Sequence, residues 1–115
     1  MSIVFTPESR NLVKQDRAAL IGQLHSFLKS KADRAYLFGS FAQNIHEPQS
    51  DIDLIVVTAT ELPFLERAGE FSGIFDIWPR IDLLVYTPGE FDRQLALAVH
   101  GGFWKSVKDS LVQIL

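Results

Sequence analysis

The segment DIDLIVVT, residues 51–58, constrains the fold of this chain more than any other part of it. Its run of aliphatic and β-branched residues is typical of a buried strand. Two carboxylates, Asp51 and Asp53, stand at its start, and side chains in a strand alternate between the two faces. The two acids therefore share one face with Ile55 and Val57, so this face is acidic at one end and apolar at the other.

Helical and extended patterns alternate along the rest of the chain. Apolar residues spaced by three or four predict helices, whereas short runs of β-branched and aliphatic residues predict strands. Helices are expected from a cap at Thr6 to about Ser30, at 41–43 with Ser40 as the cap, from Pro63 through Trp78, from a Thr87-Pro88 cap to about His100, and from Phe103 onward. Strands are expected at 34–38, 51–58 and 80–86. Residues 111–115 fit either the end of the last helix or a short strand.

This order of elements predicts an α/β (α+β) fold: a small mixed β-sheet of three or more strands with helices packed on it, in one domain spanning residues 1–115. A hydrophobic fraction of 47% over 115 residues is enough for a packed core. No apolar run approaches the ~20 residues that a membrane helix needs, and the N-terminal segment lacks the pattern of a secretory signal. We therefore expect a cytoplasmic protein without membrane contact.

Composition also narrows the classes of partner. The chain has no cysteine, which excludes a disulfide framework and a thiolate zinc site. Its net charge is −3 and its eleven Lys and Arg residues are scattered, whereas proteins that bind nucleic-acid backbones usually carry a basic surface. Nucleic acid is therefore not expected as the main partner, but a small nucleotide whose phosphates are neutralised by a metal ion is compatible with this charge.

The turn Gly39-Ser40 follows the first predicted strand and is a candidate phosphate site. Glycine lets a backbone approach a phosphate closely, and the N–H groups that open a helix attract anions. The Ser40 hydroxyl adds a further donor. A Gly-Ser pair alone is most often an ordinary turn, so its meaning depends on what lies beside it.

Three carboxylates complete the candidate site. Asp51 and Asp53 repel each other unless they are protonated or bound to cations, and Mg²⁺ takes carboxylate oxygens while leaving positions for phosphate and water. Asp82 interrupts an apolar strand and faces the same site if that strand pairs with 51–58. Each acid alone has an ordinary explanation, as a solvated loop exit or an edge-strand charge. Together they favour a site that clamps a phosphoryl or nucleotidyl transfer.

The run GSFAQNIHEPQSDIDL resembles the nucleotidyltransferase signature of Gly-Ser, a spacer, and Asp-x-Asp. This signature belongs to the DNA polymerase β-like superfamily, and the match is most similar to its minimal, single-domain branch, the minimal nucleotidyltransferases. The resemblance covers residues 36–58, and RIDLLVYTPGEF matches more loosely as the strand with the third carboxylate. It implies a Mg²⁺-dependent nucleotidyltransferase that moves a nucleoside monophosphate, expected to be AMP from ATP, to a hydroxyl acceptor and releases pyrophosphate.

The resemblance also implies a role for each matched residue. Gly39 and Ser40 would hold the terminal phosphates of the nucleoside triphosphate. Asp51 and Asp53 would bind the metal ions, two Mg²⁺ in all. Asp82 would share a metal or take the proton of the acceptor hydroxyl.

One departure and two other functions stay open. Many minimal members have Arg-Gly where this chain has Gln43-Asn44, so a phosphate partner is missing here. The alternative function is an antitoxin-type binding module that neutralises a helical HEPN-domain toxin mainly by contact, because minimal nucleotidyltransferases resemble the partners of such toxins. If the chain transfers nucleotide, its small size leaves no room for the acceptor-binding domain of larger relatives, so the acceptor hydroxyl would belong to a partner protein or bind at a homo-oligomer interface. A third interpretation is a degenerate domain with a structural role only.

Overall fold

The structure is a computed structural model that describes residues 17–44 and 51–115. The predicted cap at Thr6 and the first part of its helix lie outside these residues. In chain order the elements are α2 (Arg17–Leu28), β1 (Arg34–Phe38), α3 (Gly39–Ala42), β2 (Ile52–Val57), the 3-10 helix η1 (Phe64–Phe71), α4 (Ile74–Ile77), β3 (Ile81–Tyr86), α5 (Pro88–Leu97), the 3-10 helix η2 (Ala98–His100), α6 (Phe103–Ser110) and β4 (Val112–Gln113).

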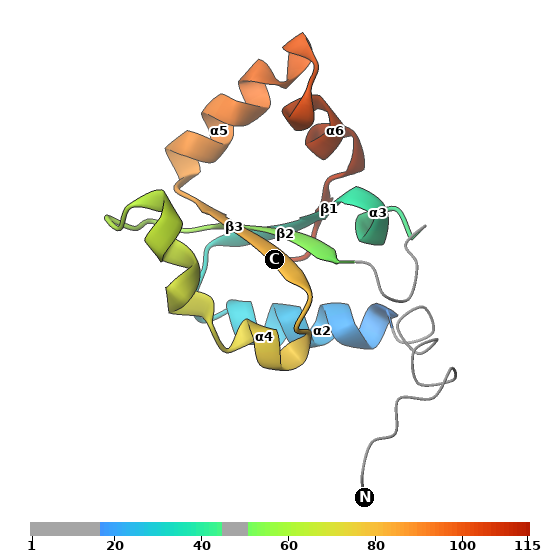
Figure 1. The fold of residues 1–115 in the computed structure, drawn as a ribbon, viewed down its shortest axis with the longest axis vertical. Helices are drawn as coiled ribbons and strands as arrows, with labels where there is room; N and C mark the ends of the chain where they lie inside the picture. Colours follow the sequence, from blue (N-terminus) through green and yellow to red (C-terminus); the bar gives the residue numbers. More distant parts are fainter. Residues whose placement is uncertain (1–16, 45–50) are drawn as a thin grey trace, which may run out of the picture.

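The strands form one mixed sheet of four, in the order β3-β2-β1-β4. β1 is antiparallel to both β2 and β4, whereas β2 and β3 are parallel. Figure 1 shows α2 and α4 on one side of the sheet and α5 and α6 on the other. The structure thus confirms the predicted fold class, a small mixed sheet with helices packed on it.

The two layers of helices create two hydrophobic cores, one on each face of the sheet. Leu54 and Val56 of β2 pack in the core on the α2 side, whereas Ile55 and Val57 pack with Phe91 of α5 in the other core. All four β2 side chains are fully buried. A central strand covered on both faces needs apolar residues at consecutive positions, and this explains the unbroken run in the sequence.

The prediction of one continuous helix from residue 63 through residue 78 is wrong. The chain forms the 3-10 helix η1 over 64–71 and then the short α4 over 74–77. A 3-10 helix repeats every three residues, so a stripe spaced by three and four fits an α-helix better, but Phe64 and Phe75 of this stripe are exposed and do not hold one continuous helix against a core. Gly73 marks the break, where a Cβ would lie only 3.0 Å from the ring of Phe27 on α2.

The C-terminal segment ends the sheet. After α6 the chain extends, and the short strand β4 pairs with β1 through Tyr36 opposite Gln113 and Leu37 opposite Val112. The choice left open for residues 111–115 is therefore decided in favour of a strand. This pairing gives the outer edge of β1 a partner, which satisfies backbone groups that would otherwise face solvent.

The helix α5 begins at the cap that the sequence predicts, Thr87-Pro88. The hydroxyl of Thr87 accepts a hydrogen bond from the backbone N–H of Glu90, and the Glu90 carboxylate accepts one from the backbone N–H of Thr87. This capping box, with Pro88 in the first turn, confirms the predicted helix start.

None of the helices within residues 17–44 and 51–115 has the length and apolarity to span a bilayer.

Candidate functional site

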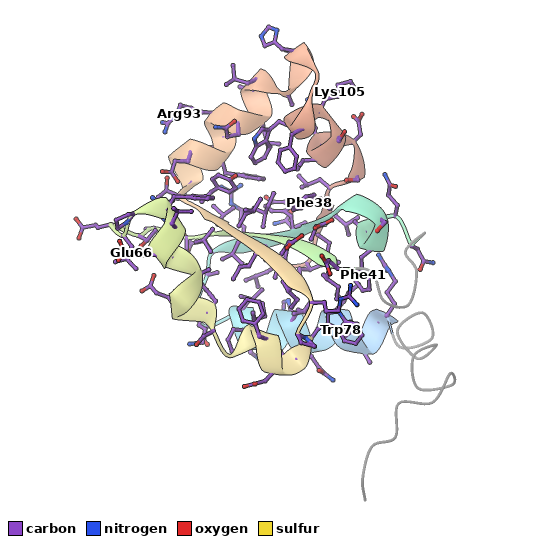
Figure 2. All side chains as sticks on the ribbon, in the orientation of Figure 1. Phe38, Phe41, Glu66, Trp78, Arg93 and Lys105 are labelled. Carbon is purple, nitrogen blue, oxygen red and sulfur yellow. The ribbon has the colours of Figure 1, made fainter. Side chains whose placement is uncertain are left out.

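The parallel strands β2 and β3 bring their acidic residues together at the same end of the sheet. Asp53 lies directly opposite Asp82 in the ladder, and Asp51 is two residues before Asp53, on the same face. Phe38 lies opposite Asp53 on β1, and Figure 2 shows it on the side of the sheet that faces α5 and α6. We call Asp51, Asp53 and Asp82 the acidic edge; the structure places β3 beside β2, as the argument from sequence required.

Asp53 is the electrostatic centre of the acidic edge. Its pKa is raised from 3.8 to about 6, first because burial disfavours its charge, then because Asp82 repels it and shares a hydrogen bond with it, and last because Asp51 repels it. Without a cation, Asp53 is therefore protonated more readily than an ordinary aspartate. The donor set consists of carboxylate oxygens only, which is the chemistry that Mg²⁺ prefers. A divalent cation fits these residues because it would replace the proton and relieve their repulsion.

Asp51 is engaged elsewhere in this structure. Its Oδ1 accepts a hydrogen bond from Nε of Arg80 at 3.2 Å, in an ion pair whose side chains are about half exposed, at 48% and 52%. Within residues 17–44 and 51–115, no set of three or more metal-binding side chains is gathered closely enough to hold an ion. The structure thus brings Asp53 and Asp82 together and pairs Asp51 with Arg80.

Gly39 fits closely against the acidic edge. Its φ of +74° lies in the region that favours glycine, and a Cβ added there would overlap the Asp53 Oδ2 atom. Its backbone N–H donates to the Ser110 hydroxyl at 2.9 Å. In this structure Gly39 therefore contributes space for the Asp53 carboxylate, while the N–H group expected to face a phosphate is held by α6.

The helix α3 begins two residues earlier than expected. It starts at Gly39, and Phe38 is its N-cap without a side-chain hydrogen bond, so the expected capping role of Ser40 is wrong. Its C-terminal end is closed by Arg17 of α2, whose guanidinium donates to the carbonyls of Phe41 and Ala42. Ser40 is half-buried and directly follows Gly39; the phosphate-binding role expected of its hydroxyl stays a prediction.

The departure at Gln43-Asn44 has a backbone explanation. Asn44 has a φ of +59°, the one positive value at a non-glycine residue in the described part of the chain. Asn accepts this left-handed conformation more readily than most residues, so it can stand where many minimal nucleotidyltransferases have Gly. Gln43 ends α3 as its C-cap and is exposed; unlike Arg, it brings no charge to a phosphate.

Two residues near the site were not chosen as site residues from the sequence. Ser110 links α6 to the turn, because its hydroxyl donates to the Ser106 carbonyl at 3.0 Å and accepts from Gly39. It lies 71 residues from Gly39 in the chain, so no local motif connects them. Arg80 directly precedes the strand of Asp82 and was visible only as one of several scattered cations.

The mixed sheet with paired acids at the start of two strands defines a nucleotidyltransferase-like domain. The family described as Polymerase beta, Nucleotidyltransferase matches residues 23–87, which are more than half of the chain and include Gly39-Ser40 and the whole acidic edge. The chain belongs to this family. The crystal structure of a putative nucleotidyltransferase from Sulfolobus solfataricus is similar, with 24% identity and a TM-score of 0.53 over 73% of this chain and 79% of that one, and this likeness shows the fold. No curated protein matches the chain.

Proposed function

We propose that this chain is a Mg²⁺-dependent nucleotidyltransferase that moves a nucleoside monophosphate to a hydroxyl acceptor, with ATP as the expected donor. The observation that carries the proposal is the pairing of Asp53 with Asp82 across the parallel strands. Such a pair is costly unless a cation binds it, as the raised pKa of Asp53 indicates. Membership of the nucleotidyltransferase family gives that cation site its chemical context.

The side chains can be given separate tasks in this reaction. Asp51, Asp53 and Asp82 would hold Mg²⁺, which when bound neutralises phosphate charge and orients the reacting groups. The Ser40 hydroxyl would donate to the terminal phosphates. The acceptor oxygen forms a bond to the α-phosphorus, the bond to the pyrophosphate oxygen breaks, and the acceptor proton passes to a carboxylate. We assign this last task to Asp82, because it is exposed whereas Asp53 is half-buried.

The direct test supplies Mg²⁺ with each labelled nucleoside triphosphate, with and without proteins encoded beside this one. The proposal expects label to appear on an acceptor, and Asp51→Asn together with Asp53→Asn to abolish it while the circular dichroism spectrum stays unchanged. Asp76→Asn is the matched control, because Asp76 is an exposed acid on α4. If the double variant transferred nucleotide as well as the native chain, the assignment would be wrong.

A second candidate function is supported by the exposed apolar residues around η2. Leu97, Val99 and Phe103 are 56%, 70% and 55% exposed and lie within seven consecutive residues at the join of α5 and α6. Clustered exposed apolar side chains are typical of a protein-binding surface. This favours the contact module, with a helical HEPN-type partner or a second copy of the chain as occupant.

The two functions separate in one co-purification experiment. Binding of a helical neighbour without nucleotide, lost on Val99→Glu but kept on Asp53→Asn, would favour the contact module. Labelled AMP on that neighbour, lost on Asp53→Asn, would favour the enzyme acting on a partner protein. If the chain bound neither Mg²⁺-ATP in calorimetry nor a partner protein, the interpretation as a domain with a structural role only would remain.

A further inference from the structure

Arg80 lies at the point where the acidic edge begins. It directly precedes β3, and its carbonyl accepts a hydrogen bond from the N–H of Ile52 at 2.8 Å, which continues the β2–β3 ladder by one position. This places it beside Asp51, with Nε 3.2 Å from Oδ1. Arg80 is also two residues before Asp82, so the two side chains leave the strand on the same face.

The Arg80–Asp51 ion pair is open to solvent and is made through a single hydrogen bond. Both side chains are about half exposed, at 52% and 48%. Exposed ion pairs of this kind stabilise proteins little, so either partner can exchange for another at small cost. One nitrogen of the guanidinium contacts Asp51, and within residues 17–44 and 51–115 the other two have no hydrogen-bond acceptor, so they can meet a second one.

The other arginines near the sheet have different tasks. Arg17 caps α3, Arg34 pairs with Asp92, and Arg67 is buried against Glu90. Within the two described ranges, Arg80 is the arginine that pairs with a carboxylate of the acidic edge. It is therefore the described guanidinium best placed to meet a phosphate brought there by a cation.

We infer that Arg80 both positions Asp51 and binds the nucleotide phosphates, an inference that rests on the proposed function. While no cation is bound, Arg80 holds Asp51 and competes with a metal ion for its oxygen. When a cation takes Asp51, the guanidinium is released toward a phosphate, which its planar fork of donors matches with two hydrogen bonds. Arg80 thus supplies the positive charge that Gln43 lacks.

The inference predicts two effects of opposite sign in one variant. Arg80→Gln should bind Mn²⁺ alone more tightly, up to about five-fold, because the competing ion pair is gone. The same variant should bind the non-transferable α,β-methylene analogue of ATP with Mg²⁺ at least ~10-fold more weakly, because a charge-assisted hydrogen bond to phosphate is lost. A residue with only a structural role would move both affinities in the same direction or neither.

The test is calorimetry of four proteins, each titrated with Mn²⁺ alone and with the analogue in the presence of Mg²⁺. The native chain is compared with Arg80→Gln, with Arg80→Lys, and with Arg93→Gln, which removes one positive charge from the outer side of α5 (Figure 2). Arg80→Lys keeps the charge but loses the planar fork of donors, so its affinity for the analogue should fall between those of the native chain and Arg80→Gln. Arg93→Gln should match the native chain in both measurements. Far-ultraviolet circular dichroism of each variant confirms that the fold is retained.

The outcomes separate this inference from the proposed function. If the native chain binds the analogue and Arg80→Gln binds it equally well, the role of Arg80 is overturned and the function stands. If the native chain binds Mn²⁺ but no nucleotide, the proposed function and the phosphate role fall together, while tighter Mn²⁺ binding by Arg80→Gln still supports the positioning of Asp51. Weaker binding of both ligands by Arg80→Gln would overturn the inference.

Discussion

Two carboxylates that lie near opposite ends of β3, Asp53 and Glu90, have pKa values shifted in opposite directions. Glu90 follows this strand, and its pKa is lowered to about 2, first by a hydrogen bond from Arg67 and then by the backbone N–H of Thr87. Asp53 lies beside the start of the strand, and its pKa is raised to about 6 by burial and by two neighbouring acids. Glu90 has a cationic partner in Arg67, whereas Asp53 has two acidic neighbours and no ion pair within residues 17–44 and 51–115.

The surroundings of Arg67 explain the difference. This side chain is 7% exposed, donates to the carbonyls of Leu62 and Val85, and forms two hydrogen bonds with Glu90, the shorter at 2.6 Å. The pair therefore fixes η1 against β3 and the start of α5. A buried charge needs such partners to be tolerated. Self-sufficient charge is typical of a structural contact, and unbalanced charge is typical of a binding site.

The largest expected effect concerns catalysis at the acidic edge. Asp53→Asn should lower the rate of nucleotide transfer by about a thousand-fold or more, because several kcal/mol of metal-derived transition-state stabilisation are lost. Glu90→Gln, assayed under conditions where it is folded, should change the rate far less. Steady-state kinetics with labelled ATP measure both, and comparable losses in the two variants would remove the functional side of the contrast.

The next effect concerns the glycine that makes room for Asp53. Gly39→Ala should destabilise the fold by ~2–4 kcal/mol, because alanine is strained at positive φ and its Cβ would displace the Asp53 carboxylate. Gly22→Ala is the matched control: this position in α2 is exposed and has nothing within 4 Å of an added Cβ. There alanine should stabilise by ~0.5–1 kcal/mol. Urea denaturation of both variants tests the prediction, and equal effects would contradict it.

The Glu90 contact should make stability depend on acidic pH. Its pKa falls from 4.5 to about 2 on folding, so the folded state binds fewer protons than the unfolded state between these values. Its stabilisation is therefore complete above about pH 4.5 and is lost as the pH falls toward 2. Thermal melts of the native chain and Glu90→Gln should differ most at neutral pH and converge in acid. A constant difference across that range would show that the contact acts without its charge.

The smallest effect has the opposite sign. The pKa of Asp53 rises from 3.8 to about 6 on folding. Without metal, the folded state therefore binds more protons than the unfolded state between these pH values, and the stability of the fold decreases as the pH rises from 3.8 to about 6. At pH 7 in EDTA, Asp53→Asn should be more stable than the native chain, by no more than ~1–2 kcal/mol because the group is partly solvated.

Adding Mg²⁺ sharpens this last comparison. The cation should raise the melting temperature of the native chain and leave that of Asp53→Asn nearly unchanged, because it stabilises the state that binds it. Asp76→Asn should respond like the native chain. If Asp53→Asn were the less stable protein in EDTA at pH 7, the view of Asp53 as an unbalanced charge would be wrong.

The sequence by itself determined the elements whose signals are local. The runs that became β1, β2 and β3 carry their strand pattern in adjacent residues, and the cap formed by Thr87 and Glu90 spans only four positions. The alternation of side chains also placed Asp51 and Asp53 on one face without any knowledge of the neighbouring strands. Gly39-Ser40 and the acids were chosen from local patterns for the same reason, and the structure places Gly39, Asp53 and Asp82 at one end of the sheet.

The tertiary structure decided everything that depends on residues far apart in the chain. It placed Asp82 opposite Asp53, paired β4 with β1, and broke the expected helix where Gly73 passes α2. It also gave the N–H of Gly39 to Ser110. Local periodicity limits the conformation of a segment, but packing and hydrogen bonding select its partners only when the whole chain is folded. The acidic edge was therefore foreseen in its residues, while its contacts with Arg80 and Ser110 were not.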